Sequence, residues 1–153
     1  MRTLLKAGLL LVAGMVVTRL AAMVVSKQCD EGSEVSDEFR RLTVMGGLEF
    51  TSRAGGLRNA EVSVIMGAAK VDLRDATIDP GGAIVLLENT MGGLALLVRD
   101  DWAVAVDDTI LGGGENEVRV TPPTDLPDDA PRLNVQVITR MGGTTISTAD
   151  ASW

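Results

Sequence analysis

The residues of this 153-residue chain that could do chemistry are mostly carboxylates. It has 21 acidic residues, no histidine and one cysteine, Cys29, so it lacks the base and nucleophile pairs of acyl transfer. Facing carboxylates could act as acid and base or hold a hard cation. Three groups of aspartates are candidates: Asp72, Asp75 and Asp79; Asp100, Asp101, Asp107 and Asp108; and Asp125, Asp128 and Asp129.

These aspartates fall around expected turns, and their spacing is not that of an EF-hand loop. We therefore interpret them as solvated corners and strand ends, and we read Cys29 as an inert thiol. The sequence predicts no catalytic, cofactor or metal site, and a protein that is not an enzyme.

Composition and charge narrow the class of partner. The formal charge of -7 disfavours nucleic acid, because phosphate binding needs a basic surface. The chain is 46% apolar but only 3% aromatic, so its core must be aliphatic. Two Trp and two Phe are too few to line a polysaccharide groove, which disfavours an enzyme of the cell wall. The length suits one domain with a short appendage, and a protein is the expected partner.

A short glycine phrase that returns five times is the most informative feature of the sequence. Its copies are Met45-Gly46-Gly47, Met66-Gly67-Ala68, Met91-Gly92-Gly93, Leu111-Gly112-Gly113 and Met141-Gly142-Gly143. The first glycines of successive copies are 20 to 30 residues apart, and the longest interval contains a proline-rich insertion at residues 121–131. A period of this size is typical of stacked supersecondary units.

Each unit reads as a β-rich run, the glycine pair, a second β-rich run and a turn. Alternation such as Val62-x-Val64 and Val71-x-Leu73 indicates strands with one buried face. Residues 39–148 are therefore predicted to form an all-β domain, a short β-helix or β-solenoid of about five glycine-cornered rungs; a β-sandwich with glycine bulges is the alternative. We expect the Met column to fill gaps in the aliphatic core, and a Thr-rich last rung to end the stack.

The N-terminal segment, residues 1–26, is predicted to be a transmembrane anchor. Residues 4–25 are almost continuously apolar, and the 20 residues from Ala7 to Ser26 would span about 30 Å as a helix, the thickness of a bilayer core. Arg19 opposes this, since a cation at the centre costs about 2.5–3.5 kcal/mol. A cleaved signal peptide and a helix that lies on the surface or caps the domain are the alternatives.

Charges around this segment favour an orientation. Arg2 and Lys6 precede it, whereas acidic residues follow it, so the positive-inside rule favours an extracytoplasmic domain and single-pass localisation in the cell membrane. Residues 27–38 are acidic and poor in apolar residues, and are expected to be a solvated linker. Residues 149–153 are expected to be a tail.

Residues 39–148 resemble the C-terminal domain of the LiaF-type proteins, the cell wall-active antibiotics response family of bacterial membrane-bound stress regulators. Three stretches carry the resemblance: 64–76 (VIMGAAKVDLRDA), 89–98 (NTMGGLALLV) and 139–146 (TRMGGTTI). Met stands where that family more often has Phe, and one apolar segment replaces several membrane spans. The resemblance implies a membrane-tethered, non-catalytic domain that modulates a cell-envelope stress response through protein contacts.

Two functions follow from these patterns. The first is a membrane-anchored regulatory or scaffolding module that binds a protein, such as a membrane-bound regulator, and can self-associate through its strand edges. The alternative is a structural protein of the bactofilin sort, whose bare ends stack into filaments. Uncharged apolar end rungs would favour the filament, but the first repeat carries Arg40, Arg41 and Glu49.

Overall fold

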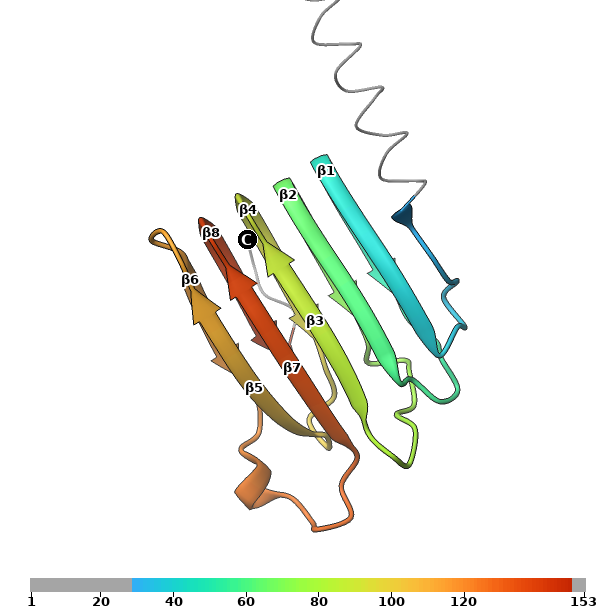
Figure 1. Ribbon diagram of the computed structural model, residues 1–153. Helices are drawn as coiled ribbons and strands as arrows, with labels where there is room; N and C mark the ends of the chain where they lie inside the picture. Colours follow the sequence, from blue (N-terminus) through green and yellow to red (C-terminus); the bar gives the residue numbers. More distant parts are fainter. Residues whose placement is uncertain (1–28, 150–153) are drawn as a thin grey trace, which may run out of the picture.

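The computed structural model describes residues 29–149, which form a nearly closed parallel sheet that wraps around an axis (Figure 1). The elements are β1 (Glu38–Thr51), β2 (Asn59–Asp72), β3 (Ala83–Asn89), β4 (Gly92–Leu97), β5 (Ala103–Ile110), β6 (Glu115–Arg119), the short 3-10 helix η1 (Pro123–Asp125), β7 (Arg132–Thr139) and β8 (Gly142–Ser147). Every pairing between these strands is parallel. The predicted all-β, β-helix-like class is confirmed.

The strands stack as layers that we call rungs. Rung 1 is β1, rung 2 is β2, rung 3 is β3 with β4, rung 4 is β7 with β8, and rung 5 is β5 with β6. In each rung the chain runs along one side, turns at the glycine phrase and returns along the second side. Gly46, Gly67, Gly92 and Gly142 pair in register through the first four rungs. The glycine phrases therefore form one continuous corner.

The order of the rungs differs from the order of the chain. From rung 3 the chain builds rung 5, and it then returns through residues 120–131 to insert rung 4 between them. The expectation that the Thr-rich repeat ends the stack is therefore wrong. Strand composition explains why β7 lies inside the stack and β5 at its end. The inward residues of β7 are apolar and at most 1% exposed: Leu133, Val135 and Val137. The inward position of β5 that pairs with Val137 is instead Asp108. A carboxylate at an inward position is tolerated only at an open end.

The core is aliphatic, as expected. Leu57, Leu73, Leu87, Leu94 and Leu96 are fully buried, and Trp102 is 2% exposed. Loops close the third side of the rungs, where Leu57 and Ile78 form an isolated parallel bridge. The core therefore runs along the axis of the stack.

The Met residues of the glycine phrases lie outside this core. Met45, Met66, Met91 and Met141 are 41–48% exposed, so the prediction that they fill gaps in the core is wrong. The residue before each glycine lies on the outer side of the corner, where about half of its side chain remains exposed. In Met45 and Met66 the backbone also has positive φ, 53° and 57°, so in rungs 1 and 2 the Met itself makes the left-handed bend.

The predicted anchor, residues 1–26, and most of the tail lie outside the described residues. Between residues 29 and 149 the structure has no helix long and apolar enough to cross a membrane. Residues 30–37, expected to belong to a solvated linker, are largely exposed but hydrogen-bond to the domain: Glu31 pairs with Arg40, and Asp37 accepts from the backbone of Arg58.

Candidate partner-binding edge

The two ends of the stack are built differently. At the rung 1 end, Glu31 forms an antiparallel bridge with Arg40 through N–O distances of 3.0 and 2.9 Å. The amide of Leu42 donates to Oδ1 of Asp30 at 2.9 Å. The incoming chain thus occupies hydrogen-bonding groups that the first half of β1 would otherwise present to solvent, and it forms a cap over this half of the end rung.

Arg41 closes the same end from within. Its guanidinium donates to the carbonyl oxygens of Glu31 at 2.7 Å, Arg40 at 2.9 Å and Gly32 at 3.1 Å. The guanidinium carbon lies 4.2 Å from the ring centroid of Phe50, which stacks against Phe39. Arg41 is 8% exposed, so its charge is buried but satisfied by three carbonyls and an aromatic face. It joins the cap to the core.

A polar network crosses the interior near the corner of rungs 3 to 5. The Asn89 amide donates to the carbonyl oxygens of Gly143 at 2.8 Å and Gly92 at 3.1 Å. The hydroxyls of Thr139 and Thr144 lie 2.8 Å apart, and Thr139 donates to Oδ1 of Asn116 at 2.6 Å. The network links the inserted rung 4 to both neighbours and leads to the open end.

At that open end, rung 5 has a neighbour on one side only among residues 29–149. β5 pairs with β7 and β6 pairs with β8, and neither has a second partner strand. The proline-rich loop reaches the start of β5, where it lines a hollow beside Ala103 and Ala105. Beyond that point, Asp107 to Ile110 and most of β6 are exposed. The outer backbone groups of these strands are available for pairing.

This edge is acidic. Rung 5 carries four carboxylates and one guanidinium: Asp107, Asp108, Glu115, Glu117 and Arg119. Arg119 forms an ion pair with Glu117 of the same strand at 2.5 Å, and the Asn116 amide donates to Asp108 at 3.4 Å. Exposed Val118 lies between Glu117 and Arg119, and exposed Ile110 and Leu111 follow Asp107 and Asp108 at the corner. The edge therefore combines free backbone, negative charge and apolar contact surface.

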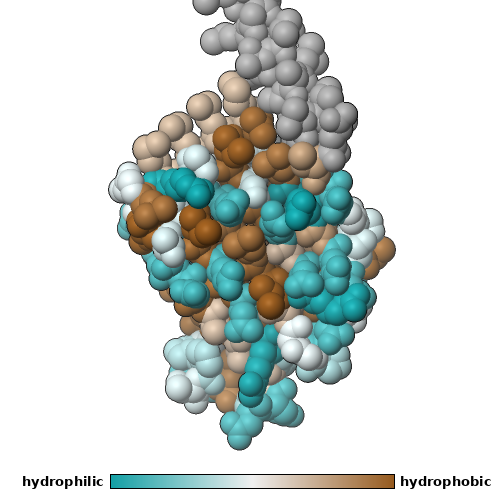
Figure 2. Space-filling view, in the orientation of Figure 1, coloured by the Kyte–Doolittle hydropathy of each residue, from teal (hydrophilic) through white to brown (hydrophobic). Residues whose placement is uncertain are grey.

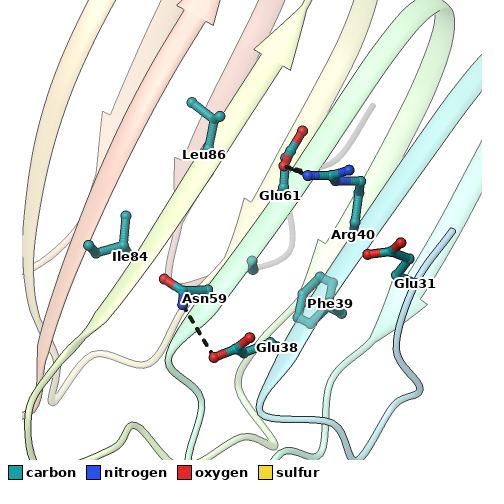
Figure 3. Close-up of a pocket in the computed structure, with 9 residues that line it drawn as sticks. Glu31, Glu38, Phe39, Arg40, Asn59, Glu61, Ile84 and Leu86 are labelled. Carbon is teal, nitrogen blue, oxygen red and sulfur yellow. Dashed lines mark hydrogen bonds and ion pairs between the residues drawn. The ribbon is translucent and has the colours of Figure 1, made fainter. Parts of the chain in front are cut away.

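A shallow depression of about 340 Å³ lies over β1, β2 and β3 near the capped end (Figure 3). In it Arg40 pairs with Glu61 at 2.8 Å, and the Asn59 amide donates to Glu38 at 3.5 Å. Ile84 forms part of the opposite wall. These polar groups are engaged with one another across the depression.

Three of the aspartates considered as chemical candidates serve local structure. Asp72 binds the guanidinium of Arg74 at 2.6 Å, and this hydrogen bond holds the pKa of Asp72 below its usual range. Asp101 binds Arg99 at 2.7 Å, which lowers the pKa of Asp101 in the same way. Asp79 accepts from the amide of Gly81 at 2.9 Å in a turn.

The remaining candidates do not assemble a metal site. Asp128 and Asp129 line a hollow that also contains Asp79 and Arg132, whereas Asp100, Asp107 and Asp108 are exposed. Across the part of the chain that the structure describes, no three acidic, histidine or cysteine side chains come together so that they could hold a metal ion. Among these candidates, the structure shows an aspartate turn at Asp79 and ion pairs at Asp72 and Asp101.

Sequence reasoning missed the residues that distinguish the two ends. Arg41 counts in the sequence only as a charge of the first repeat, although its position between Phe39 and Thr43 in an alternating strand indicates an inward side chain. Asn89 shares the register position of Val64 in the rung below, and this break in an apolar column was the available signal.

The fold and its edge define a class: a parallel β-helix-like domain with one capped and one open end. The chain matches no protein-family model, and no curated protein or solved structure is significantly similar to it.

Proposed function

We propose that this protein is a non-catalytic, membrane-anchored regulatory module that binds a protein partner along the outer edge of rung 5. The observation that carries the proposal is the difference between the two ends. The first half of β1 is covered by Glu31 and Arg41, whereas the edge of rung 5 presents unpaired strand backbone. A stack that caps one end and leaves the other open is suited to adding a strand at the open end.

The charge of this edge indicates the kind of strand that would add. Asp107 and Asp108 are exposed and adjacent on β5, and Glu115 follows the corner. A partner strand with Lys or Arg beside these positions gains charge-assisted hydrogen bonds in addition to the backbone ladder. Exposed Ile110 and Val118 would contact apolar side chains of the same partner.

The same features favour a different protein over a second copy as the occupant. Two rung 5 edges brought together would oppose acidic residues on both sides, which is destabilising. Head-to-tail stacking would require the edge of rung 1, where Glu31 and Asp30 already bond to β1. A filament of the bactofilin sort would therefore have to displace the cap.

The apolar segment at residues 4–25 supports the membrane-anchored part of the proposal. The resemblance of residues 39–148 to LiaF-type C-terminal domains supports a regulatory role in the cell-envelope stress response, with a membrane-bound regulator as partner. We place the domain on the extracytoplasmic side, in keeping with Arg2 and Lys6 before the segment.

The test is site-specific crosslinking in native membranes. A photoreactive residue at Thr109, on the open edge of the full-length chain, is expected to give one discrete heterologous product. The product should be lost in the double variant Asp107→Lys, Asp108→Lys and should weaken with salt. The same photoreactive residue at Asn59, beside the capped end, is the matched control and should not give this product.

The outcomes separate the candidates. A Thr109 product with the mass of two copies of the chain would support the polymer and contradict the proposal. Equal products from Thr109 and Asn59, or a product that survives the charge reversal, would also contradict it. If the full-length chain is recovered outside the membrane fraction, the anchoring part fails independently of the edge.

A further inference from the structure

A row of exposed apolar side chains follows the glycine corner through the whole stack. Adjacent rungs place Met45, Met66, Met91, Met141 and Leu111 next to one another, and each is 41–49% exposed. We call these five residues the Met ridge. At the usual strand spacing of roughly 4.8 Å, its four steps span about 19 Å. Exposed Ile65 and Ile110 lie beside it.

This is the main concentration of exposed apolar surface in residues 29–149. Of ten large hydrophobic side chains that are strongly exposed, seven lie at the corner: Met45, Ile65, Met66, Met91, Ile110, Leu111 and Met141. Apolar side chains also gather along the upper edge of the space-filling view, where the strands turn in Figure 1 (Figure 2). A grouping of this kind marks an interaction surface rather than scattered exposure.

Carboxylates are excluded from this corner. The five corner segments, residues 44–47, 65–68, 90–93, 110–114 and 140–143, contain no Asp or Glu and one cation, Arg140, in a chain with a formal charge of -7. Arg140 is exposed and reaches Oγ1 of Thr90 at 3.5 Å. The ridge is therefore an apolar line with one positive charge on an otherwise acidic domain.

The first described residues run toward the same corner. The bridge between Glu31 and Arg40 is antiparallel, so moving upstream from Glu31 follows β1 toward Met45. Asp30 is already level with Leu42, about 10 Å from Met45 at the strand rise. Residues 26–29 can reach at most about 14 Å when extended. The described chain therefore begins within reach of the level of the ridge, and the predicted anchor precedes it in the sequence.

We infer that the Met ridge rests on the bilayer surface, with its side chains at the boundary between headgroups and acyl chains and Arg140 among the lipid phosphates. This inference rests on the proposed membrane anchor. A bilayer is favoured over a protein partner because the described chain begins near this corner, on the side of the predicted anchor, and because flexible Met side chains adapt to a fluid surface. It also orients the stack, since the rungs then stand with their corners toward the membrane.

The test uses the full-length chain with Cys29→Ser, reconstituted in phosphatidylcholine vesicles. An environment-sensitive fluorophore is attached to one introduced cysteine, at Met91→Cys or Met141→Cys, where the backbone φ is ordinary. Ile84→Cys is the matched control, because Ile84 is 49% exposed but lies on the outer side of β3 away from the corner. Lipids carrying a nitroxide on the acyl chain should quench most of the fluorescence at residues 91 and 141 and little at residue 84.

Three results would overturn the inference, and they are distinguishable. If the chain floats with the vesicles but residues 91 and 141 are no more quenched than residue 84, the anchor stands and the ridge does not touch lipid. If residues 91 and 141 are protected from a water-soluble quencher without being quenched by lipid, protein covers the ridge, either a second copy or the segment 4–25. If the chain does not float, the proposed anchor fails and the inference fails with it.

Discussion

The Cα of Gly92 faces the carbonyl oxygen of Gly67 in the rung below so closely that a Cβ on Gly92 would overlap that oxygen. The same relationship joins Gly142 to Gly92 and Gly67 to Gly46. Each glycine of the column is thus the site at which one rung approaches the next, and Gly92 also has a φ of 152°. The repeat in the sequence reflects this contact between rungs.

Gly92→Ala is expected to destabilise the domain strongly. The added methyl forces rungs 2 and 3 apart, and overpacking of this kind costs about 1–3 kcal/mol even before the unfavourable φ is counted. Urea unfolding of the full-length chain in detergent, followed by far-UV circular dichroism, would measure the loss.

Gly46→Ala is the matched control for this variant. Gly46 belongs to the same column, but it lies in the terminal rung and an added Cβ would meet nothing within 4 Å. Its unfolding midpoint should stay close to that of the unmodified chain. Equal losses for Gly46→Ala and Gly92→Ala would show that close approach between rungs is not the reason for the glycines.

Asn89→Asp should destabilise the domain at neutral pH. It replaces an amide donor with a carboxylate oxygen that faces the carbonyl oxygens of Gly92 and Gly143, at an expected cost of about 3 kcal/mol or more. Burial among these acceptors raises the pKa of the new carboxyl in the folded state. Protonation therefore relieves the penalty, and the variant should regain stability relative to the unmodified chain as the pH falls.

The control for this variant is Asn134→Asp, which makes the same chemical change on β7 at an exposed outward position. Its stability difference should be small and nearly independent of pH. Thermal unfolding of both variants and of the unmodified chain across a pH series would measure these stability differences. An Asn89→Asp variant as stable as Asn134→Asp at neutral pH would contradict the interior network.

Arg41→Leu should loosen the cap on rung 1. Leu fills part of the volume but cannot donate to the carbonyls of Glu31 and Gly32, so residues 30–33 lose their tie to the core, at a cost of about 2–4 kcal/mol. Proteolysis near residues 30–37 should become faster. Arg40→Leu, on the same strand but outward and half exposed, should change stability by less than about 1 kcal/mol. Similar protease sensitivity in both variants would show that Arg41 does not hold the cap in place.

The β-helix-like class could be predicted from the sequence because the residues that define each rung recur periodically along the chain. Glycines at the corner and alternating residues such as Val62 and Val64 repeat in each rung, and any in-register stack must align them. The location of the Met residues was predicted incorrectly because the sequence does not show which side of a corner is convex. Hydrophobicity suggested burial of Met66, although the bend turns it outward.

The exchange of rungs 4 and 5 is a matter of topology, and repeats alone do not specify it. The chain order of repeats does not determine their spatial order once a connection such as residues 121–131 is long enough to cross a rung. The clue was the difference between β5 and β7: Asp108 interrupts the inward pattern of β5, whereas Leu133, Val135 and Val137 continue that of β7. Inward charge identifies an edge strand, and uninterrupted alternation identifies a central one.

The ion pair between Asp72 and Arg74 should make stability depend on pH in the acid range. The hydrogen bond from Arg74 lowers the pKa of Asp72 in the folded state, so the pair stabilises the domain above the unfolded pKa of about 3.9 and loses this effect as the pH falls through the folded value. Asp72→Asn should therefore cost about 1 kcal/mol or less at neutral pH, since both side chains are partly exposed. The difference from the unmodified chain should shrink below about pH 4. A difference that persists unchanged to low pH would show that Asp72 acts through its shape or its backbone contact with Arg74 rather than through its charge.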